Sequence, residues 1–178
     1  MNSPWSQDKY RLALNFAAHA HHGQTMPGSK HPYLVHLVLV AMEVQAALQV
    51  EAGWDGDLAI QCALLHDTLE DTQTTLQQVQ EVFGLAVAEG VLALTKREDL
   101  PKEQAMADSL QRIQMQPKEI WLVKLADRIV NLSSTRPCWS PEKNRFYRDE
   151  GWLIYQALAP ATPYLAERLQ QKIEQFLA

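Results

Sequence analysis

Four polar residues interrupt an apolar, helix-forming stretch at residues 62–72. His66 and Asp67 form one pair, and Glu70 and Asp71 follow about one helical turn later. On a continuous helix, residues four apart lie on one face, so each member of the first pair is expected to lie below its counterpart in the second, in two adjacent columns. Ionised carboxylates in apolar surroundings are costly unless compensated, and a divalent cation is an efficient compensator. The pattern favours a metal site with acid/base groups beside it.

Two further stretches carry polar residues inside apolar helices. Lys124, Asp127 and Asn131 are three and four positions apart, so they share one helical face. His36 lies among aliphatic residues near a predicted helix start. With the His66–Asp67 pair, these stretches would supply two histidines and two aspartates from packed helices. Such a mixed nitrogen and oxygen site leaves coordination positions open for water and substrate oxygens.

Each feature also has an ordinary structural interpretation. His36 alone is typical of a core histidine bonded to a backbone group. The His66–Asp67 pair alone is compatible with a partly exposed polar face. Lys124 and Asp127 alone are compatible with an intrahelical ion pair on a solvated face. The combination, in this order and with these apolar flanks, favours the metal site.

Helical periodicity runs through nearly the whole chain, and hardly any stretch alternates with period two. We therefore predict an all-α fold, a single domain over residues 1–178 with about eight to ten helices. Loops rich in proline, glycine, serine or charge are expected at residues 24–31, 96–102 and 133–141. The predicted helices cover residues 8–22, 33–50, 57–71, 74–83, 85–95, a segment from Lys102 through Met115, and residues 117–132, 142–159 and 163–177.

Composition excludes several functional classes. The chain has 178 residues, 47% of them hydrophobic, and 16 basic against 21 acidic side chains give a net charge of −5. This acidic balance disfavours duplex nucleic acid and anionic membranes as partners. A chain of this length can bury about two-thirds of its unfolded surface unaided, so any metal is expected to be functional and not structural.

The sequence also predicts where the protein resides. Cys62 and Cys138 have no CxxC spacing and are expected to be reduced thiols. The N-terminal residues lack the apolar core of a signal peptide, and no apolar stretch is long enough to span a bilayer. We therefore expect a soluble cytoplasmic protein.

An early histidine, a His-Asp pair and a distant aspartate on separate helices resemble the HD superfamily of metal-dependent phosphohydrolases, an all-α helical bundle. More narrowly, the chain is similar to the hydrolase domain of the RelA/SpoT proteins over about residues 10–155, with the helices at 142–177 completing it. With no room for a synthetase or regulatory domain, it resembles the free-standing small alarmone hydrolases of the metazoan SpoT homologue type. The motifs are Ala20–Gln24 (AHHGQ), Pro32–His36 (PYLVH), Ala63–Thr72 (ALLHDTLEDT), Phe83–Gly84 and Val123–Leu132 (VKLADRIVNL).

The resemblance implies an activity and a cofactor. Members of this family bind one Mn²⁺ ion and hydrolyse the 3′-pyrophosphate of (p)ppGpp, the alarmone of the stringent response, giving GDP or GTP and pyrophosphate. The cation makes a water more acidic and offsets charge on the phosphate oxygens. Glu70 and Asp71 would be the catalytic residues that orient or deprotonate this water. The implied metal ligands are His36, His66, Asp67 and Asp127.

The resemblance also implies contacts with a nucleotide, the expected small-molecule partner. Lys124 and Asn131, on the face of Asp127, would contact the substrate or support the ligands. Lys96 is a candidate for binding phosphate, and Tyr155 is a candidate for a position near the nucleotide. The oligomeric state is not indicated.

One segment departs from the family pattern. Where RelA/SpoT hydrolase domains commonly carry an Arg-Lys pair that packs on guanine, this chain has Met26 and Pro27. Loss of a guanidinium that stacks on a base removes about 1–2 kcal/mol of recognition. Met26 can still pack against a ring, and Lys30 is a partial substitute. The metal site is unaffected, whereas the preference for guanine is open.

Two alternatives to (p)ppGpp hydrolysis therefore remain. The first is a phosphohydrolase of another nucleotide with a 2′- or 3′-phosphate, such as a 2′-phosphatase of NADPH. The second is a catalytically silent module that binds an alarmone. Glu70 and Asp71 argue against the second, because a binding module has no use for a pair that activates water.

Overall fold

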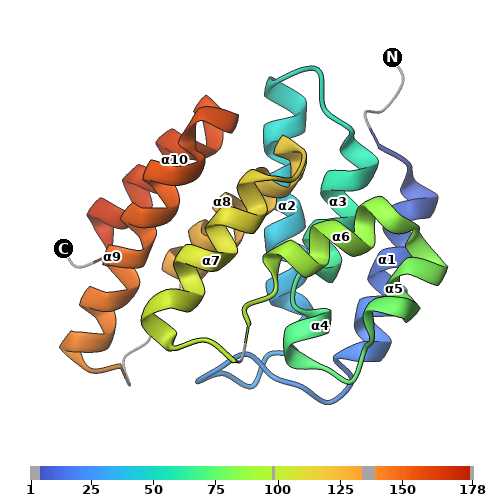
Figure 1. The fold of residues 1–178 in the computed structure, drawn as a ribbon, viewed down its shortest axis with the longest axis horizontal. Helices are drawn as coiled ribbons and strands as arrows, with labels where there is room; N and C mark the ends of the chain where they lie inside the picture. The colour runs from blue at the N-terminus through green and yellow to red at the C-terminus, as the bar shows by residue number, and fades with distance from the viewer. Residues whose placement is uncertain (1–4, 98, 134–138, 177–178) are drawn as a thin grey trace.

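The structure is a computed structural model that describes residues 5–97, 99–133 and 139–176. Within these ranges the chain forms ten α-helices and one short 3-10 helix, and Thr25 and Pro32 form an isolated β-bridge (Figure 1). The predicted all-α fold is confirmed. The helices are α1 (Gln7–Ala20), α2 (Leu34–Val50), α3 (Gly56–Leu65), α4 (Thr68–Asp71), α5 (Leu76–Phe83), α6 (Leu85–Leu94), α7 (Lys102–Gln114), α8 (Lys118–Ser133), α9 (Pro141–Leu158), η1 (Ala159–Ala161) and α10 (Pro163–Gln175).

Side-chain caps explain where several helices begin. The hydroxyls of Ser6 and Thr162 accept hydrogen bonds from backbone amides in the first turns of α1 and α10. Thr75 forms a capping box with Gln78 at the start of α5. Gly84 separates α5 from α6 with a φ of 85°, which side chains with a Cβ atom rarely adopt. The boundaries therefore follow from local hydrogen bonding and backbone sterics.

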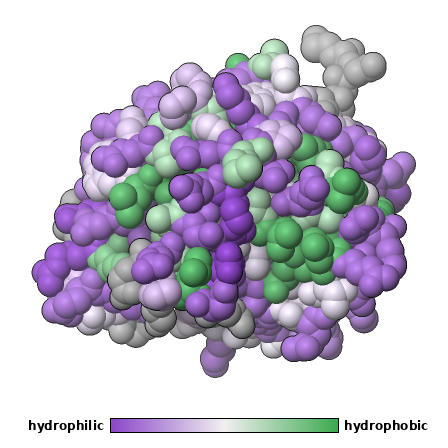
Figure 2. All heavy atoms as spheres, in the orientation of Figure 1, coloured by the Kyte–Doolittle hydropathy of each residue, from purple (hydrophilic) through white to green (hydrophobic). Residues whose placement is uncertain are grey.

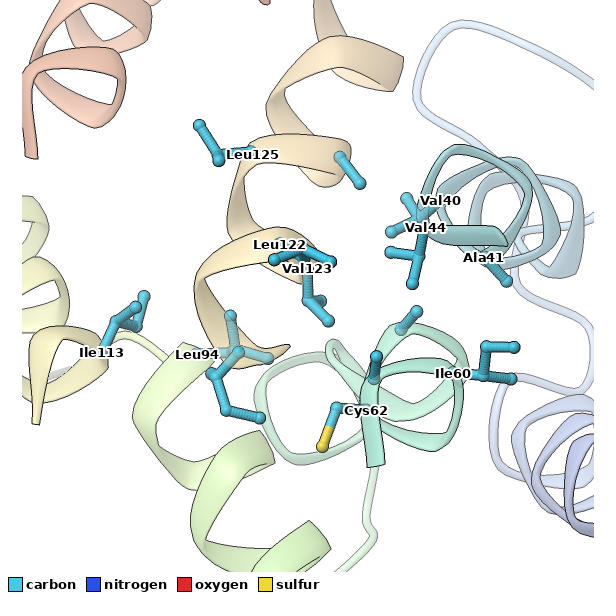
Figure 3. Packing of buried hydrophobic residues seen from close by; sticks show 14 of the residues in the cluster. Val40, Ala41, Val44, Ile60, Cys62, Leu94, Ile113, Leu122, Val123 and Leu125 are labelled. Carbon is cyan, nitrogen blue, oxygen red and sulfur yellow. The ribbon is translucent and has the colours of Figure 1, made fainter. Parts of the chain in front are cut away.

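Helix α8 is the centre of the packing. It contacts α2, α3, α9 and α10, and α9 packs against α10. Figure 3 shows Val40 and Val44 of α2 facing Leu122 and Val123 of α8, with α3 beside them. Leu122 and Val123 are fully buried, and each such side chain contributes roughly 1.5–3 kcal/mol to stability. The polar residues that begin α2, end α3 and lie on α8 are therefore held by a common core.

Helix α6 approaches this core closely at Gly90. A Cβ atom built there would lie 2.5 Å from Ile120 Cδ1 and 2.9 Å from Cys62 Sγ. Only glycine allows this spacing, because no real Cβ contact is so short. The close approach brings the end of α6, at Leu94, to the cavity described below.

The predicted continuous helix over residues 57–71 is wrong, because α3 ends at Leu65 and α4 begins at Thr68. Asp67 has φ −100° and ψ −1°, off the regular helical geometry. The Thr68 hydroxyl donates to the carbonyl oxygen of Leu65 at 2.6 Å, so a side chain replaces part of the backbone ladder. The backbone N–H of Asp71 still donates to the carbonyl oxygen of Asp67 at 2.9 Å, so the four-residue spacing of these two carboxylates is kept at the start of α4. His66 and Asp67 lie in the break between two helices.

The other expected helices are observed, with ends shifted by one or two residues. The predicted loop at 133–141 falls largely on residues 134–138, which lie outside the described residues, as does Cys138. Cys62 is a buried free thiol.

Within the described residues, every helix is too short or too polar to cross a membrane. The face shown in Figure 2 is largely hydrophilic, with apolar side chains in separate patches.

Candidate active site

Three parts of the fold bring four side chains together. His36 comes from the first turn of α2, His66 and Asp67 from the break between α3 and α4, and Asp127 from the middle of α8. The Nε2 atoms of His36 and His66 are 3.3 Å apart. His66 Nε2 lies 2.9 Å from Asp67 Oδ2, and His36 Nε2 lies 3.4 Å from Asp127 Oδ1. Residues 91 positions apart in the sequence thus converge on one point.

These atoms fit a cation. One ligand atom from each of His36, His66 and Asp67 lies within 4.8 Å of the others. Asp127 Oδ1 lies beside this group, 3.4 Å from Nε2 of His36 and 3.8 Å from Nε2 of His66. His66 Nδ1 is 2.8 Å from the carbonyl oxygen of Ala63. In a neutral ring that donates its Nδ1 hydrogen to that oxygen, the Nε2 lone pair is directed at the cluster, which is typical of metal-binding histidines.

Electrostatics keep the carboxylates ionised, which is the form that binds cations. Burial alone would raise the pKa of Asp127, but the Lys124 ammonium and the two imidazoles hold it well below its usual range. Burial likewise opposes ionisation of Asp67, and the imidazoles of His66 and His36 outweigh it and lower that pKa. Burial lowers the pKa of His36, but hydrogen bonds to Asp127 and Asp67 raise it to about 9.

The α8 residues that the sequence places on one helical face contact each other. Asn131 Nδ2 donates to Asp127 Oδ1 at 2.5 Å. Lys124 Nζ lies 3.4 Å from Asp127 Oδ2, and its side chain is buried. Because both partners bond to the carboxylate, they fix its orientation, and both also line the adjoining cavity.

Helix α4 places two further carboxylates at this cavity. Glu70 Oε2 accepts a hydrogen bond from the backbone N–H of Lys96 at 2.9 Å, which fixes the segment after α6. Partial desolvation and the charge of Asp67 raise the pKa of Asp71. A carboxylate with a raised pKa is a better proton acceptor near neutral pH. Glu70 and Asp71 thus stand beside the cluster in two different environments.

The cavity has a volume of about 180 Å³ and opens over the cluster. Of the residues expected to contact substrate, Met26, Lys96, Lys124 and Asn131 line it. The cavity also borders residues to which the sequence assigns no role. These are Pro27, Tyr33, Leu94, Arg128 and Tyr147.

Tyr155 does not line the cavity, so the structure does not bring it together with the other residues expected to contact substrate. Its hydroxyl lies 3.5 Å from Gln170 Oε1 on α10, and its ring packs edge-on against Trp152. Tyr147 of the same helix lines the cavity instead. Eight residues along a helix correspond to about 12 Å and a rotation of about 80°, so one aromatic residue faces the cavity and the other faces α10.

Arg128 and Tyr33 are contributors that sequence reasoning missed. Arg128 is buried, pairs with Glu150 Oε2 at 3.1 Å and lies 4.6 Å from the centre of the Tyr147 ring. The Tyr33 hydroxyl donates to Asp67 Oδ2 at 2.6 Å. Burial and the charge of Asp67 raise the pKa of Tyr33, so its phenol remains a donor. Two features of the sequence could have indicated these residues: Arg128 follows Asp127 directly, and Tyr33 lies three positions before His36.

Comparison with known proteins identifies the family of this chain. The family model described as HD domain matches residues 13–163. A mouse (Mus musculus) guanosine-3′,5′-bis(diphosphate) 3′-pyrophosphohydrolase is 33% identical over 168 residues, which cover 92% of each chain. The bifunctional (p)ppGpp synthase/hydrolase SpoT of Escherichia coli K12 is 36% identical over 157 residues, covering 85% of this chain and 21% of SpoT.

A solved structure agrees with this assignment at the level of the fold. A metazoan ortholog of SpoT, described as hydrolysing ppGpp, superposes with a TM-score of 0.82 at 23% identity over 96% of each chain. The HD domain and the cluster around His36, His66 and Asp67 together imply a divalent metal. The chain therefore belongs to the HD domain family, in the branch that contains the guanosine-3′,5′-bis(diphosphate) 3′-pyrophosphohydrolases.

Proposed function

We propose that this protein is a Mn²⁺-dependent hydrolase that removes pyrophosphate from the 3′ position of (p)ppGpp and yields GDP or GTP. The observation that carries the proposal is the convergence of two imidazole nitrogens and two carboxylates at the floor of one cavity. Relatives named for this reaction match over nearly the whole chain, which supports the choice of substrate.

His36, His66, Asp67 and Asp127 would hold the cation. When bound, the cation supplies Lewis acidity toward water and phosphate oxygens. Lys124 and Asn131 keep the Asp127 carboxylate in one orientation through contacts of 3.4 and 2.5 Å. The resemblance to the RelA/SpoT hydrolases implies Mn²⁺, and a mixed set of imidazole nitrogen and carboxylate oxygen donors is compatible with this ion.

Glu70 and Asp71 would serve as the proton acceptors. A water oxygen attacks the phosphorus bonded to the ribose 3′ oxygen, and the bond between that phosphorus and the 3′ oxygen breaks. One proton of the water passes to a carboxylate oxygen of the pair, and the 3′ oxygen leaves as a hydroxyl after taking up a proton. The raised pKa of Asp71 suits it to accept and return a proton.

Local cations would attract the polyphosphate, since the net charge of the chain is −5. Lys124 lies beside the cluster, and Lys96 lines the cavity next to Glu70. A long-range basic field is not available, so binding depends on these side chains and on the metal. Activity is therefore expected to be negligible after the metal is removed.

A second candidate substrate is a nucleotide with a 2′-phosphate such as NADPH. The observation that favours it is that Met26 and Pro27 line the cavity, so its wall carries a thioether and a pyrrolidine ring instead of a basic pair. Such a wall packs on any planar base without selecting guanine.

A substrate panel decides between the two. The purified Mn²⁺ protein is incubated separately with ppGpp and with NADPH, and release of pyrophosphate and of phosphate is followed. We expect pyrophosphate to be released from ppGpp. Its absence at every metal concentration, with phosphate released from NADPH, would replace the first substrate by the second. The absence of both products would contradict catalysis.

A further inference from the structure

A chain of contacts connects the end of α1 to the metal cluster through Tyr33. The Tyr33 hydroxyl donates to Asp67 Oδ2 at 2.6 Å. Its ring stacks on the His21 imidazole, with centroids 4.9 Å apart and planes 18° from parallel. His21 Nδ1 lies 2.6 Å from Gln24 Oε1. We propose that Tyr33 is a positioning residue that orients Asp67 for cation binding, and that His21 and Gln24 hold the Tyr33 ring in place.

Asp67 needs such a partner because of where it lies in the chain. It occupies the break between α3 and α4, and its side chain caps neither helix. A carboxylate at this point is free to rotate unless another side chain holds it. A charge-assisted hydrogen bond from a phenol is short and directional, and it uses one lone pair while leaving others for a cation. His66 Nε2 lies 2.9 Å from the same oxygen, Oδ2, which therefore faces the cluster.

The loop between α1 and α2 is folded so that Tyr33 meets His21. The backbone N–H of Tyr33 donates to the carbonyl oxygen of Gln24 at 2.9 Å, and Thr25 and Pro32 form a bridge. The loop therefore returns on itself and brings the start of α2 over the end of α1. In Figure 1 it follows the lower edge of the molecule, beneath α4.

The chemistry of His21 indicates that its stack on Tyr33 and its contact with Gln24 orient the two rings as well as pack them. His21 is 4% exposed, and its Nε2 atom has no hydrogen-bond partner among the described residues. A buried polar atom without a partner destabilises a fold by about 1–3 kcal/mol. A phenyl ring would stack without that penalty, so what imidazole adds is the contact with Gln24. That contact fixes the plane against which Tyr33 lies.

Metal affinity tests the proposal, which rests on the cation site of the proposed function. The protein is stripped of metal with a chelator and titrated with Mn²⁺ by calorimetry, as wild type and as Tyr33→Phe. Tyr33→Phe keeps the ring and removes only the donor, so we expect a dissociation constant raised about tenfold or more. Tyr10→Phe, the same change on α1 far from the cluster, serves as the matched control and is expected to bind as wild type. An unchanged affinity in Tyr33→Phe would overturn the proposal.

A purely structural role of the hydroxyl predicts different results. Such a role would lower the melting temperature of metal-free Tyr33→Phe and leave its Mn²⁺ affinity intact. The positioning role predicts a loss of Mn²⁺ affinity in the folded variant, whatever the change in its melting temperature. If the wild type binds Mn²⁺ but does not hydrolyse ppGpp, the proposed function is wrong while the positioning role of Tyr33 can still hold. If the wild type hydrolyses ppGpp and Tyr33→Phe binds Mn²⁺ normally, the positioning role of Tyr33 is wrong while the proposed function holds.

A double-mutant cycle tests the part played by His21. His21→Ala removes the stack, and we expect about a threefold loss of Mn²⁺ affinity in the wild-type background. In the Tyr33→Phe background we expect no further loss, because His21 acts only through the tyrosine hydroxyl. Equal losses in both backgrounds would show that His21 acts independently and would refute the chain of contacts.

Discussion

The two ends of the cavity are built differently. At its floor, His36, His66 and Asp127 are buried and extend from elements that pack together in the main core. At its wall, Met26 comes from a loop and Tyr147 from α9, and both are only partly buried. The floor cannot move without disturbing the core, whereas wall residues can change with little effect on packing. We therefore expect the chemistry and the choice of substrate to be separable in this fold.

The largest expected effect comes from removing a floor ligand. Asp127→Ala should abolish Mn²⁺ binding and hydrolysis together, because the carboxylate is a proposed ligand and the partner of both Lys124 and Asn131. The helical fold should persist, since the core does not depend on the ion. Calorimetric titration and circular dichroism measure the two properties. Wholesale unfolding would show instead that the floor is structural.

A second variant, at Glu70 beside the floor, separates chemistry from binding. Glu70→Gln retains an oxygen that accepts the hydrogen bond from Lys96 but loses the ability to take a proton. We expect kcat to fall about 10²–10⁴-fold with nucleotide affinity retained. Single-turnover kinetics and nucleotide titration provide the measurements. Full activity would remove Glu70 from the mechanism and leave Asp71 as the proton acceptor.

At the wall, the effect should appear in binding. The ring of Tyr147 contacts both Trp139 and Arg128, and these contacts hold it at the cavity edge. Tyr147→Ala should raise the KM about tenfold with little change in kcat, as expected for loss of one aromatic contact with a base. Steady-state kinetics test this. A larger rise of the KM in Tyr155→Ala would contradict the placement of the two tyrosines.

The smallest expected effect is a change in the preference between ppGpp and NADPH as substrates. Met26→Arg introduces a guanidinium that can stack on a base, so kcat/KM for ppGpp relative to NADPH should rise about fivefold. Metal affinity should stay the same, because the wall does not contribute ligands. Parallel assays on the two nucleotides measure the ratio. A change in Mn²⁺ affinity would show that the floor and the wall are coupled.

The same division explains what the sequence could predict. The floor residues were identifiable because polar side chains interrupt apolar helices, and helical spacing alone placed Asn131 and Lys124 beside Asp127. The break at His66 and Asp67 was not predicted, because it depends on the hydrogen bond from the Thr68 hydroxyl to a backbone oxygen. The helical spacing of apolar residues continues across the break and gives no sign of it.

Wall residues depend on tertiary packing and so were harder to predict. Tyr147 and Tyr155 lie on one helix, and only the packing of α9 against α8 and α10 decides which of them faces the cavity. Tyr33 acts on Asp67 across 34 positions of sequence, a relation that periodicity does not contain. The role of Arg128 depends on Glu150 and Tyr147 in the same way.

We propose that four side chains at the floor of the cavity, those of His36, His66, Asp67 and Asp127, form the cation site. Crystals grown with Mn²⁺ and measured near the manganese absorption edge test it most directly. We predict one strong anomalous peak between the Nε2 atoms of His36 and His66 and the carboxylates of Asp67 and Asp127. Manganese bound elsewhere on the chain, with this position empty, would contradict it.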